Sequence, residues 1–430
     1  MGYSQGLSGL SAASNELDTI GNNIANSSTT GFKSGTAEFA DMYANTVATA
    51  VSTPSGIGVS TVTIAQNFGE GTFSNTGVPL DVAINGNGFF RMSVNGQVEY
   101  SRDGEFHTDA NGYLIDAEGA NVTGYTVGTD GVVSSTNPQP IQVPMGNMQP
   151  AQTSIVNTSA LNLDSSAAAP TTTPFNPTDD TSYSYSDSIT TYDSLGDSHQ
   201  MQLYYVRDTP ASPIAYSVYA AQDGTLIPAQ GTATTAVTGL IGTLSFSTSG
   251  TLTGFTAAGT AVQTNTDEVA ISNIPTSTGA TDPEATINFN FANATAYGGT
   301  GNTANLQPDG NPAGNFVSAS IDENGNVVCS YTNGKTETVA QLVLASFNNN
   351  NGLTPVGNNK WVQSSTSGEP TLGTAGSGTF GDLETESLEN SNVDLTGSLV
   401  DLITAQRYYQ ANAQTIKTQN TVDQTLLNMS

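Results

Sequence analysis

The chain has 430 residues, 36% of them hydrophobic, and its 37 acidic residues against eight basic ones give a formal net charge of −29. Charge of this sign repels nucleic-acid phosphates and anionic membranes, so we expect neither as a partner. The single cysteine, Cys329, excludes an intramolecular disulfide. The two histidines, His107 and His199, have no second His or Cys at metal-ligand spacing, so the sequence predicts no metal, cofactor or catalytic residue.

The N-terminal residues predict a helix over 1–24. Leu7, Leu10, Leu17 and Ile24 recur at helical spacing, with Ser4 as a plausible N-cap. The segment lacks the basic start and apolar centre of a cleaved secretion signal, and no stretch of the chain approaches the roughly 18 apolar residues of a membrane span. If the protein is exported, we expect a route without signal cleavage.

The turn that follows this helix contains a lysine in the run "GFKS", which invites comparison with a phosphate-binding loop. Such a loop needs Gly, four residues, then Gly-Lys. Here Phe32 separates Gly31 from Lys33, and Asn26 stands where the first glycine should be. The spacing therefore argues against a nucleotide site, and the turn formers before Gly31 indicate a helix exit.

Residues 80–127 alternate apolar and polar positions between glycine turns. Asn95-Gly96 and Asn111-Gly112 are strong hairpin signals, so we expect an antiparallel β domain here. Alternating strands resume in "TTYDSLGDSHQMQLYYVR", residues 190–207, and predict a second β domain inserted into the first. A third hairpin at Asn324-Gly325 marks the return to the first domain.

Two acidic segments invite a functional interpretation. Asp322, Asn324 and Asn326 match the first ligands of an EF-hand loop, but Val327 replaces its glycine and Asn333 its final glutamate, so a hairpin turn is favoured. The second segment, "GDLETESLENS", is expected to be flexible and solvated. Neither predicts a catalytic carboxylate.

The C-terminal residues 392–430 predict a long helix with a heptad stripe, begun by a capping box of Ser391 and Asp394. The stripe falls on positions 395, 399, 402, 406, 409, 413, 416, 420, 423 and 427. Gln406, Asn420 and Asp423 interrupt it, and such breaks lower stability while they specify a partner. We expect Leu402, at its middle, to be exposed in the single chain and buried in an assembly.

Together these patterns predict a mainly β, nested, multidomain chain whose terminal helices pair as a coiled coil. The expected divisions are an inner coiled-coil domain, a linker region, a first β domain and an outer β domain. Their bounds are 1–24 with 392–430, 25–70 with 387–391, 71–144 with 313–386, and 145–312.

At both ends and in the first β domain the sequence resembles a known family. The stretches "GLSGLSAASNELDTIGNNIANSSTTGFKSGTAEFADM", "LDVAINGNGFFRM", "YSRDGEF" and "LGTAGSGTFGDLETESLENSNVDLTGSLVDLITAQRYYQANAQTIKTQ" are similar to the rod and hook family of axial proteins of the bacterial flagellum. The segment 190–207 resembles the start of an outer domain that hook members have and shorter distal-rod members lack. The hook members are therefore the closer match.

The resemblance implies a structural subunit, not an enzyme, that polymerises into a bendable tube joining rod to filament. It implies an extracellular hook location, export through the flagellar type III apparatus, and contacts with the distal rod, hook cap and hook-filament junction proteins. The family signature falls on Asn22, Asn23, Asn26, Gly31, Phe32 and Lys33. The expected assembly interface is Leu7, Leu10, Leu17, Ile24, Leu395, Leu399, Leu402, Tyr409, Ile416 and Leu427.

Three other readings of the sequence stay open at this point. A distal rod protein is the alternative within the family, and the insertion at 145–312 argues against it. A secreted β-rich adhesin that holds glycans or calcium fits the Thr/Ser-rich middle but leaves the terminal stripes unexplained. A β-rich hydrolase would need a carboxylate whose substitution abolishes turnover.

Overall fold

The chain forms two compact units in a computed structural model. The structure describes residues 2–43, 56–128, 133, 137–146, 148, 153–208, 213–227, 238–258, 262–271, 274 and 286–429. Unit 1 comprises Met1–Met145, Val317–Ser330 and Thr336–Ser430, and unit 2 comprises Gly146–Phe316 and Tyr331–Lys335. The mainly β, nested architecture with terminal helices that the sequence predicts is confirmed. The division into four domains stays a prediction.

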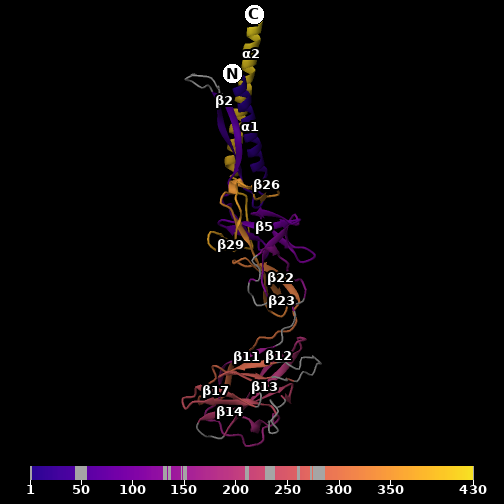
Figure 1. Ribbon diagram of the computed structural model, residues 1–430, viewed down its shortest axis with the longest axis vertical. Helices are drawn as coiled ribbons and strands as arrows, with labels where there is room; N and C mark the ends of the chain where they lie inside the picture. Colours follow the sequence, from indigo (N-terminus) through magenta and orange to yellow (C-terminus); the bar gives the residue numbers. More distant parts are fainter. Residues whose placement is uncertain are drawn as a thin grey trace. The chain divides into compact units, whose positions relative to one another are not determined.

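The two ends of the chain meet as an antiparallel helix pair in unit 1 (Figure 1). Helix α1 spans Gly2–Ala25 and α2 spans Leu395–Met429. The helices approach closely because two positions of α1 lack a side chain: a Cβ added at Gly6 would lie 2.9 Å from Ile416 Cγ1, and one at Gly9 would lie 2.8 Å from Asn412 Oδ1. Two glycines therefore set the register of the pair.

The predicted starts of both helices are wrong in detail. Asp394 is the N-cap of α2, because its Oδ1 accepts from the backbone N–H groups of Thr396 and Gly397 at 3.0 and 3.1 Å. The Ser391–Asp394 capping box does not form, since Ser391 lies outside the helix and accepts from Val393 N–H. Ser4 lies inside α1, which begins at Gly2.

The region expected as a linker contains a long hairpin that packs on α1. Strand β1, Gly35–Tyr43, pairs antiparallel with β2, Gly56–Gln66. Polar side chains of α1 hold the hairpin: Gln5 Nε2 donates to Gly56 O at 2.7 Å, and Asn15 Nδ2 donates to Thr61 Oγ1 at 3.0 Å. One side of α1 thus faces α2 and another faces this hairpin, as Figure 1 shows.

The body of unit 1 is a 13-stranded sheet with strand order β22-β23-β24-β9-β5-β6-β27-β26 along its main path. Its strands are β5 Phe89–Val94, β6 Gln97–Ser101, β7 Phe106–Thr108, β8 Leu114–Asp116, β9 Asn121–Thr126, β10 Gln139–Pro140, β22 Phe316–Ile321, β23 Asn326–Tyr331, β24 Thr336–Leu342, β25 Leu344–Ser346, β26 Thr354–Gly357, β27 Lys360–Val362 and β28 Thr371–Gly373. A 3₁₀ turn, Asn350–Gly352, precedes β26. Phe89, Tyr100, Phe347 and Trp361 pack edge to face in one core cluster.

The predicted hairpin turns of this sheet are confirmed. Asn95 and Gly96 join β5 to β6 with φ of 51° and 86°. Asp322, the first residue of the calcium-like segment, accepts from the backbone N–H groups of Asn324 and Asn326 at 2.9 and 2.8 Å. Its carboxylate therefore closes the turn between β22 and β23.

Four short strands connect the sheet to the terminal helices. Strand β29, Asp382–Thr385, pairs with β4, Val82–Asn85, and β30, Ser387–Glu389, pairs with β3, Phe73–Asn75. The acidic segment expected to be flexible is therefore hydrogen-bonded sheet, because it pairs with strands some 300 residues earlier that the sequence does not identify as its partners.

Unit 2 packs two sheets around one apolar core. The five-stranded sheet contains β11 Ile155–Asn162, β18 Val262–Asn265, β19 Glu268–Ile271, β20 Ile287–Asn290 and β21 Asn302–Pro308. The six-stranded sheet contains β12 Tyr185–Tyr192, β13 Ser198–Arg207, β14 Ile214–Gln222, β15 Thr225–Leu226, β16 Leu240–Phe246 and β17 Leu252–Ala257, and a 3₁₀ turn, Asp180–Ser182, precedes it. Alternate residues such as Met201, Leu203 and Tyr205 point into the core.

Candidate functional site

The C-terminal stripe expected to form the helix seam is displaced in the structure. Among the described side chains of α2, the partly or fully buried positions are Gly397, Ser398, Leu402, Ala405, Asn412, Ala413, Ile416 and Gln419. They share Leu402, Ala413 and Ile416 with the predicted stripe. Gln406, Asn420 and Asp423, expected as polar breaks in the seam, are exposed instead.

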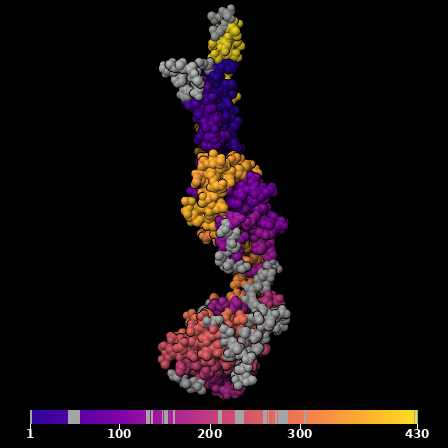
Figure 2. All heavy atoms as spheres, viewed as in Figure 1, coloured from indigo at the N-terminus to yellow at the C-terminus, as the bar shows by residue number. Residues whose placement is uncertain are grey.

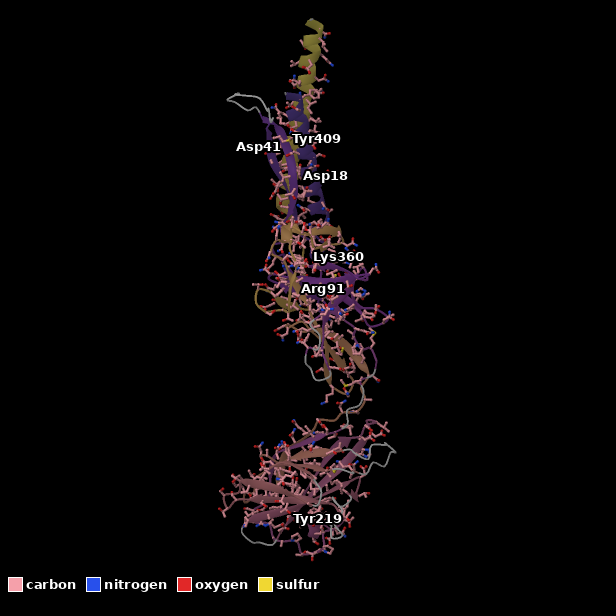
Figure 3. All side chains as sticks on the ribbon, in the orientation of Figure 1. Asp18, Asp41, Arg91, Tyr219, Lys360 and Tyr409 are labelled. Carbon is pink, nitrogen blue, oxygen red and sulfur yellow. The ribbon has the colours of Figure 1, made fainter. Side chains whose placement is uncertain are left out.

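Leu402 is half-buried in the single chain, so the expectation that it is exposed until assembly is wrong. It lies one turn from Ala405, which is completely buried. Tyr409 lies at the border of the seam, and Figure 3 shows it on the paired helices, on which Asp18 is labelled as well. The displaced register follows from Gly6 and Gly9, because α2 approaches closest where α1 is thinnest.

Apolar side chains outside the seam stay open to solvent. Leu395, Leu399, Val400 and Ile403 form an exposed strip over the first turns of α2, which we call the α2 apolar strip. On α1, Leu7 is exposed, while Leu10, Leu17 and Ile24 are half-buried beside the seam.

The last residues of α2 extend past the start of α1. Ile416 lies beside Gly6, so the residues after about 420 extend past Gly2, the first described residue of α1, over a length of about 15 Å. Figure 2 shows this part of α2, in yellow, clear of the indigo residues of α1. Leu427 here is 75% exposed.

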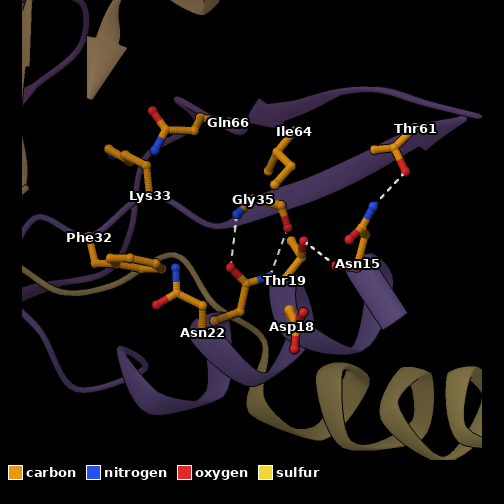
Figure 4. Close-up of a pocket in the computed structure, with 11 residues that line it drawn as sticks. Asn15, Asp18, Thr19, Asn22, Phe32, Lys33, Gly35, Thr61, Ile64 and Gln66 are labelled. Atoms are coloured by element: carbon orange, nitrogen blue, oxygen red, sulfur yellow. Dashed lines mark hydrogen bonds between the residues drawn. The ribbon is translucent and has the colours of Figure 1, made fainter. Parts of the chain in front are cut away.

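Three signature asparagines fasten the end of α1 to the hairpin and to the following turn. Asn23 Nδ2 donates to Gly35 O at 2.8 Å, and its Oδ1 accepts from Gly35 N at 2.9 Å. Figure 4 shows these two bonds as dashed lines at Gly35. Asn26 Nδ2 donates to Asn22 Oδ1 at 2.8 Å and to Asn22 O at 3.0 Å. A cavity of about 420 Å³ between α1 and β2 is lined by Asn15, Asp18, Thr19, Asn22, Asn23, Phe32, Lys33, Gly35, Thr61, Ile64 and Gln66.

Gly31 lets the turn pass close to the sheet. Its φ is 67°, a value that favours glycine, and a Cβ there would lie 2.8 Å from Asp103 N and 2.9 Å from Arg102 C. Its N–H donates to Glu389 O at 2.8 Å, and Phe32 N–H donates to Thr29 O within the turn. The exit from α1 is thus bonded to the strand that leads into α2.

Lys33 forms the centre of a buried ion cluster. Its Nζ lies 2.6 Å from Glu389 Oε1, and both side chains are fully buried. Arg102 Nη1 lies 3.4 Å from Glu389 Oε2 and Gly71 N–H donates to Oε1 at 2.8 Å. We call Lys33, Glu389 and Arg102 the ion-paired junction. Burial lowers the pKa of Lys33, and the Glu389 carboxylate acts in the opposite direction.

The ion-paired junction joins five parts of the chain. Lys33 Nζ also donates to Gly69 O at 2.9 Å, and Arg102 Nη2 donates to Gly86 O at 2.8 Å. Asn392 continues the network, since its Oδ1 accepts from Ser34 N–H at 2.8 Å and its Nδ2 donates to Gly69 O at 2.9 Å. The signature turn, the loop after β2, the residue after β4, the residue after β6, and β30 with the residues that follow it therefore order together.

Sequence reasoning missed Glu389, Arg102 and Asn392 as parts of this site. One signal was available, because a lysine that is the only charged residue between Asp18 and Glu38 needs an acidic partner if it is buried. With 37 acidic residues in the chain, no pattern selects Glu389.

None of the described helices is apolar enough over sufficient length to cross a membrane. Among the described residues, no cluster of His, Cys, Asp or Glu is placed to hold a metal.

Four stretches of the chain match flagellar protein families. Residues 5–33 match the flagella basal body rod protein family, and residues 384–429 match the FlgEFG protein C-terminal region of the flagellar basal body rod. Residues 83–161 match the D1 domain of flagellar hook protein FlgE/F/G. Residues 162–311 match the D2 domain of flagellar basal body protein FlaE.

Full-length relatives decide between these flagellar families. The chain is 42% identical over 435 residues to "Flagellar hook protein FlgE" of Salmonella typhimurium, with 100% of both chains covered. The chain belongs to the flagellar hook protein family. Hook proteins of Escherichia coli, at 41% identity over 433 residues and 100% of both chains, and of Treponema pallidum, at 29% over 457 residues and 99% and 98%, are further relatives. The hook family is structural and forms part of the flagellar hook and basal body.

A solved hook protein shares the fold. The structure of Helicobacter pylori flagellar hook protein FlgE2 superposes with a TM-score of 0.54 at 16% identity, covering 74% of this chain and 100% of that one. At this identity the likeness concerns the fold alone. The signature turn, α1 from residue 5 onward and all of α2 lie within the stretches that match flagellar basal body rod families.

Proposed function

We propose that the chain is the hook subunit that assembles through its terminal helices into a bendable tube and transmits torque from rod to filament. The observation that carries this proposal is the apolar surface left open on the paired helices. Leu395, Leu399, Val400 and Ile403 are exposed over consecutive turns of α2, and Leu7 is exposed on α1. A contiguous apolar strip of this kind is typical of a surface that another protein covers.

A second copy of the chain is the occupant that we propose for this strip. The α2 apolar strip lies at one end of the helix pair, and the projecting end of α2, with Leu427, lies at the other. Contacts between unlike surfaces are heterologous, and they generate helical filaments when the rotation from one subunit to the next does not close into a ring. Covering the exposed half of one leucine contributes about 1 kcal/mol. Individually weak contacts of this size add up only in a polymer.

The ion-paired junction gives these helices a fixed attachment. Lys33, Glu389 and Arg102 tie the exit of α1 and the entry of α2 to the sheet of unit 1. Torque that reaches the helices is therefore passed to the sheet through buried ionic and backbone hydrogen bonds. For the same reason we interpret the family signature as an anchor of the assembly helices and not as a ligand site.

Further parts of the proposal follow from the hook's place between rod and filament. We propose an extracellular location, export by the flagellar type III apparatus, and end contacts with the distal rod, hook cap and hook-filament junction proteins, without catalytic activity. The four-part division of the chain and the interface residues named from its sequence belong to this proposal. A distal rod protein is the second candidate, and the match of residues 162–311 to a D2 domain and the full-length hook relatives argue against it.

Leu399→Asp tests the assembly surface. Leu399 is 47% exposed, so we expect the free energy of unfolding of the dilute chain to change by less than about 0.5 kcal/mol. In the polymer the carboxylate would be buried without a partner, so sedimentable tubes and swimming should be lost.

Val356→Asp is the matched control, because Val356 is 49% exposed and lies on β26, outside the helices. The control should assemble. Tubes formed by Leu399→Asp at the wild-type critical concentration would contradict the proposed surface.

A further inference from the structure

The segment 190–207, which resembles the start of an outer domain in hook proteins, contains a buried histidine that the assembly function does not use. His199 lies at the start of β13, and its side chain is 4% exposed. Its Nδ1 lies 2.7 Å from Asp223 Oδ2, and its Nε2 lies 3.4 Å from Asp193 Oδ2. Asp193 belongs to the turn between β12 and β13, and Asp223 to the turn between β14 and β15. One imidazole therefore bridges two turns of unit 2.

The second oxygen of each carboxylate accepts from backbone N–H groups. Asp193 Oδ1 accepts from Leu195 and Asp197, both at 2.9 Å, and so shapes the turn 193–197. Asp223, at φ 51°, accepts from Gln200 N–H through Oδ1 at 2.9 Å and donates its own N–H to Gln200 O. In each carboxylate the other oxygen, Oδ2, faces the ring.

The ring must donate from both nitrogens to satisfy this arrangement. Ionised carboxylates only accept hydrogen bonds, whereas a neutral imidazole has a single N–H. The contact between Nδ1 and Asp223 Oδ2 is the shorter of the two, at 2.7 Å. In the neutral ring we therefore expect the remaining proton to stay on Nδ1. Loss of one proton would place the Nε2 lone pair against the Asp193 carboxylate.

From this geometry we propose that His199 is a proton-dependent latch in unit 2. The imidazolium form donates hydrogen bonds to Asp193 and Asp223 and so joins the turn 193–197 to the turn at Asp223. The neutral form keeps only the hydrogen bond to Asp223 and releases the turn 193–197. The released turn carries Leu195, whose side chain is exposed at its tip. The latch belongs to unit 2 and the terminal helices belong to unit 1, so the inference stands independently of the proposed assembly.

The electrostatics agree in direction with the geometry. Burial lowers the pKa of His199, but the hydrogen bonds and charges of Asp223 and Asp193 outweigh burial and raise the pKa above 6.5. These two carboxylates are the charged groups that act on the ring. Because the folded pKa is the higher one, the stabilisation is complete below pH 6.5 and is lost as the pH rises through the folded pKa.

Nuclear magnetic resonance of the full chain in dilute solution tests the latch. The chain has two histidines, so His107→Gln, which changes the exposed one, assigns both imidazole signals and serves as the control. We expect the His199 signal to titrate above pH 6.5. Over the same range, the protection factors of the Leu195 and Asp197 amides should fall about tenfold or more, as loss of one charge-assisted hydrogen bond predicts.

Three variants separate the latch from simple stability. In His199→Gln these amides should be weakly protected at every pH, and in His107→Gln the pH response should remain. Asp193→Asn keeps the Asp223 contact, so it should retain the fold, lower the His199 midpoint and abolish the response of the turn. Titration of His199 at or below pH 6.5, or amide protection that stays level through its titration, would overturn the proposal.

Discussion

Glu389→Gln tests the ion-paired junction, because this substitution changes charge at nearly constant volume. Glu389 Oε1 accepts from Lys33 Nζ at 2.6 Å and from Gly71 N–H at 2.8 Å, while Oε2 faces Arg102 Nη1 at 3.4 Å. A glutamine retains one acceptor oxygen, and its amide NH₂ must face one of the two cations. Two buried positive charges then remain without a counter-charge. We expect unit 1 to be strongly destabilised.

The size of the loss follows from the remaining contacts. Removal of one partner from a buried ion pair costs about 3–5 kcal/mol. The lower end applies here, about 3 kcal/mol, because Lys33 keeps the Gly69 carbonyl and Arg102 keeps the carbonyl of Gly86. For a unit of this size, that loss lowers the Tm by roughly 6–12 °C. Lys33→Met should cost less, since Glu389 keeps Arg102 and the Gly71 N–H.

The assay is urea unfolding of the dilute chain, followed by tryptophan fluorescence. Trp361 is the only tryptophan and reports on unit 1, where it is 2% exposed and its indole N–H donates to Gln66 Oε1 at 2.6 Å. Glu384→Gln is the matched control, because Glu384 is exposed on the neighbouring β29. The control should change the free energy of unfolding by less than about 0.5 kcal/mol.

An equal, small effect of Glu389→Gln and Glu384→Gln would refute the reasoning. It would mean that the cluster is hydrated or that Lys33 is neutral in the folded chain, so that the carboxylate contributes no net stabilisation. A larger loss of unfolding free energy for Lys33→Met than for Glu389→Gln would also contradict it, because two uncompensated buried cations should cost more than the loss of one cation.

Two further predictions concern the same region of unit 1. Gly31→Ala should destabilise unit 1 by at least about 1 kcal/mol more than Gly96→Ala. Both glycines have positive φ, so each substitution adds roughly 1–2 kcal/mol of backbone strain. Of the two, only Gly31 has backbone atoms within 3 Å of the added Cβ. Equal urea midpoints would show that the turn moves away freely. Burial raises the pKa of Asp103 to about 6 from 3.8, so the folded chain binds a proton more tightly and stability declines as the pH rises from 3.8 through 6. Asp103→Asn should flatten this decline in Trp361-monitored unfolding at pH 4.5 and 7, and an unchanged slope would exclude Asp103 as its source.

The sequence by itself determined the kinds of elements and their nested order. Period-two runs with Asn-Gly turns specify antiparallel strands, and the turns at Asn95 and Asn324 formed where these local signals placed them. Helical spacing at both ends specified the two terminal helices. Such signals are local, because turn chemistry and side-chain period depend on a few neighbouring residues.

Tertiary structure decided which faces of the helices meet. A heptad pattern on α2 allows neighbouring registers that differ by less than one turn, and the predicted stripe and the observed seam share Leu402, Ala413 and Ile416. The register of the helix pair is set by the closest approach at Gly6 and Gly9 of α1. The sequence of α2 alone does not reveal this position. The register also depended on the β1–β2 hairpin, which occupies the polar side of α1.

Tertiary structure also decided the role of Lys33. Its immediate sequence describes a glycine turn and excludes a phosphate loop, but its charge is compensated by Glu389, 356 residues later. That partner lies in a segment that looks solvated in sequence, and it is buried only because β30 pairs with β3. A buried charge is specified by the groups that surround it in space, and in this chain those groups come from five separate segments.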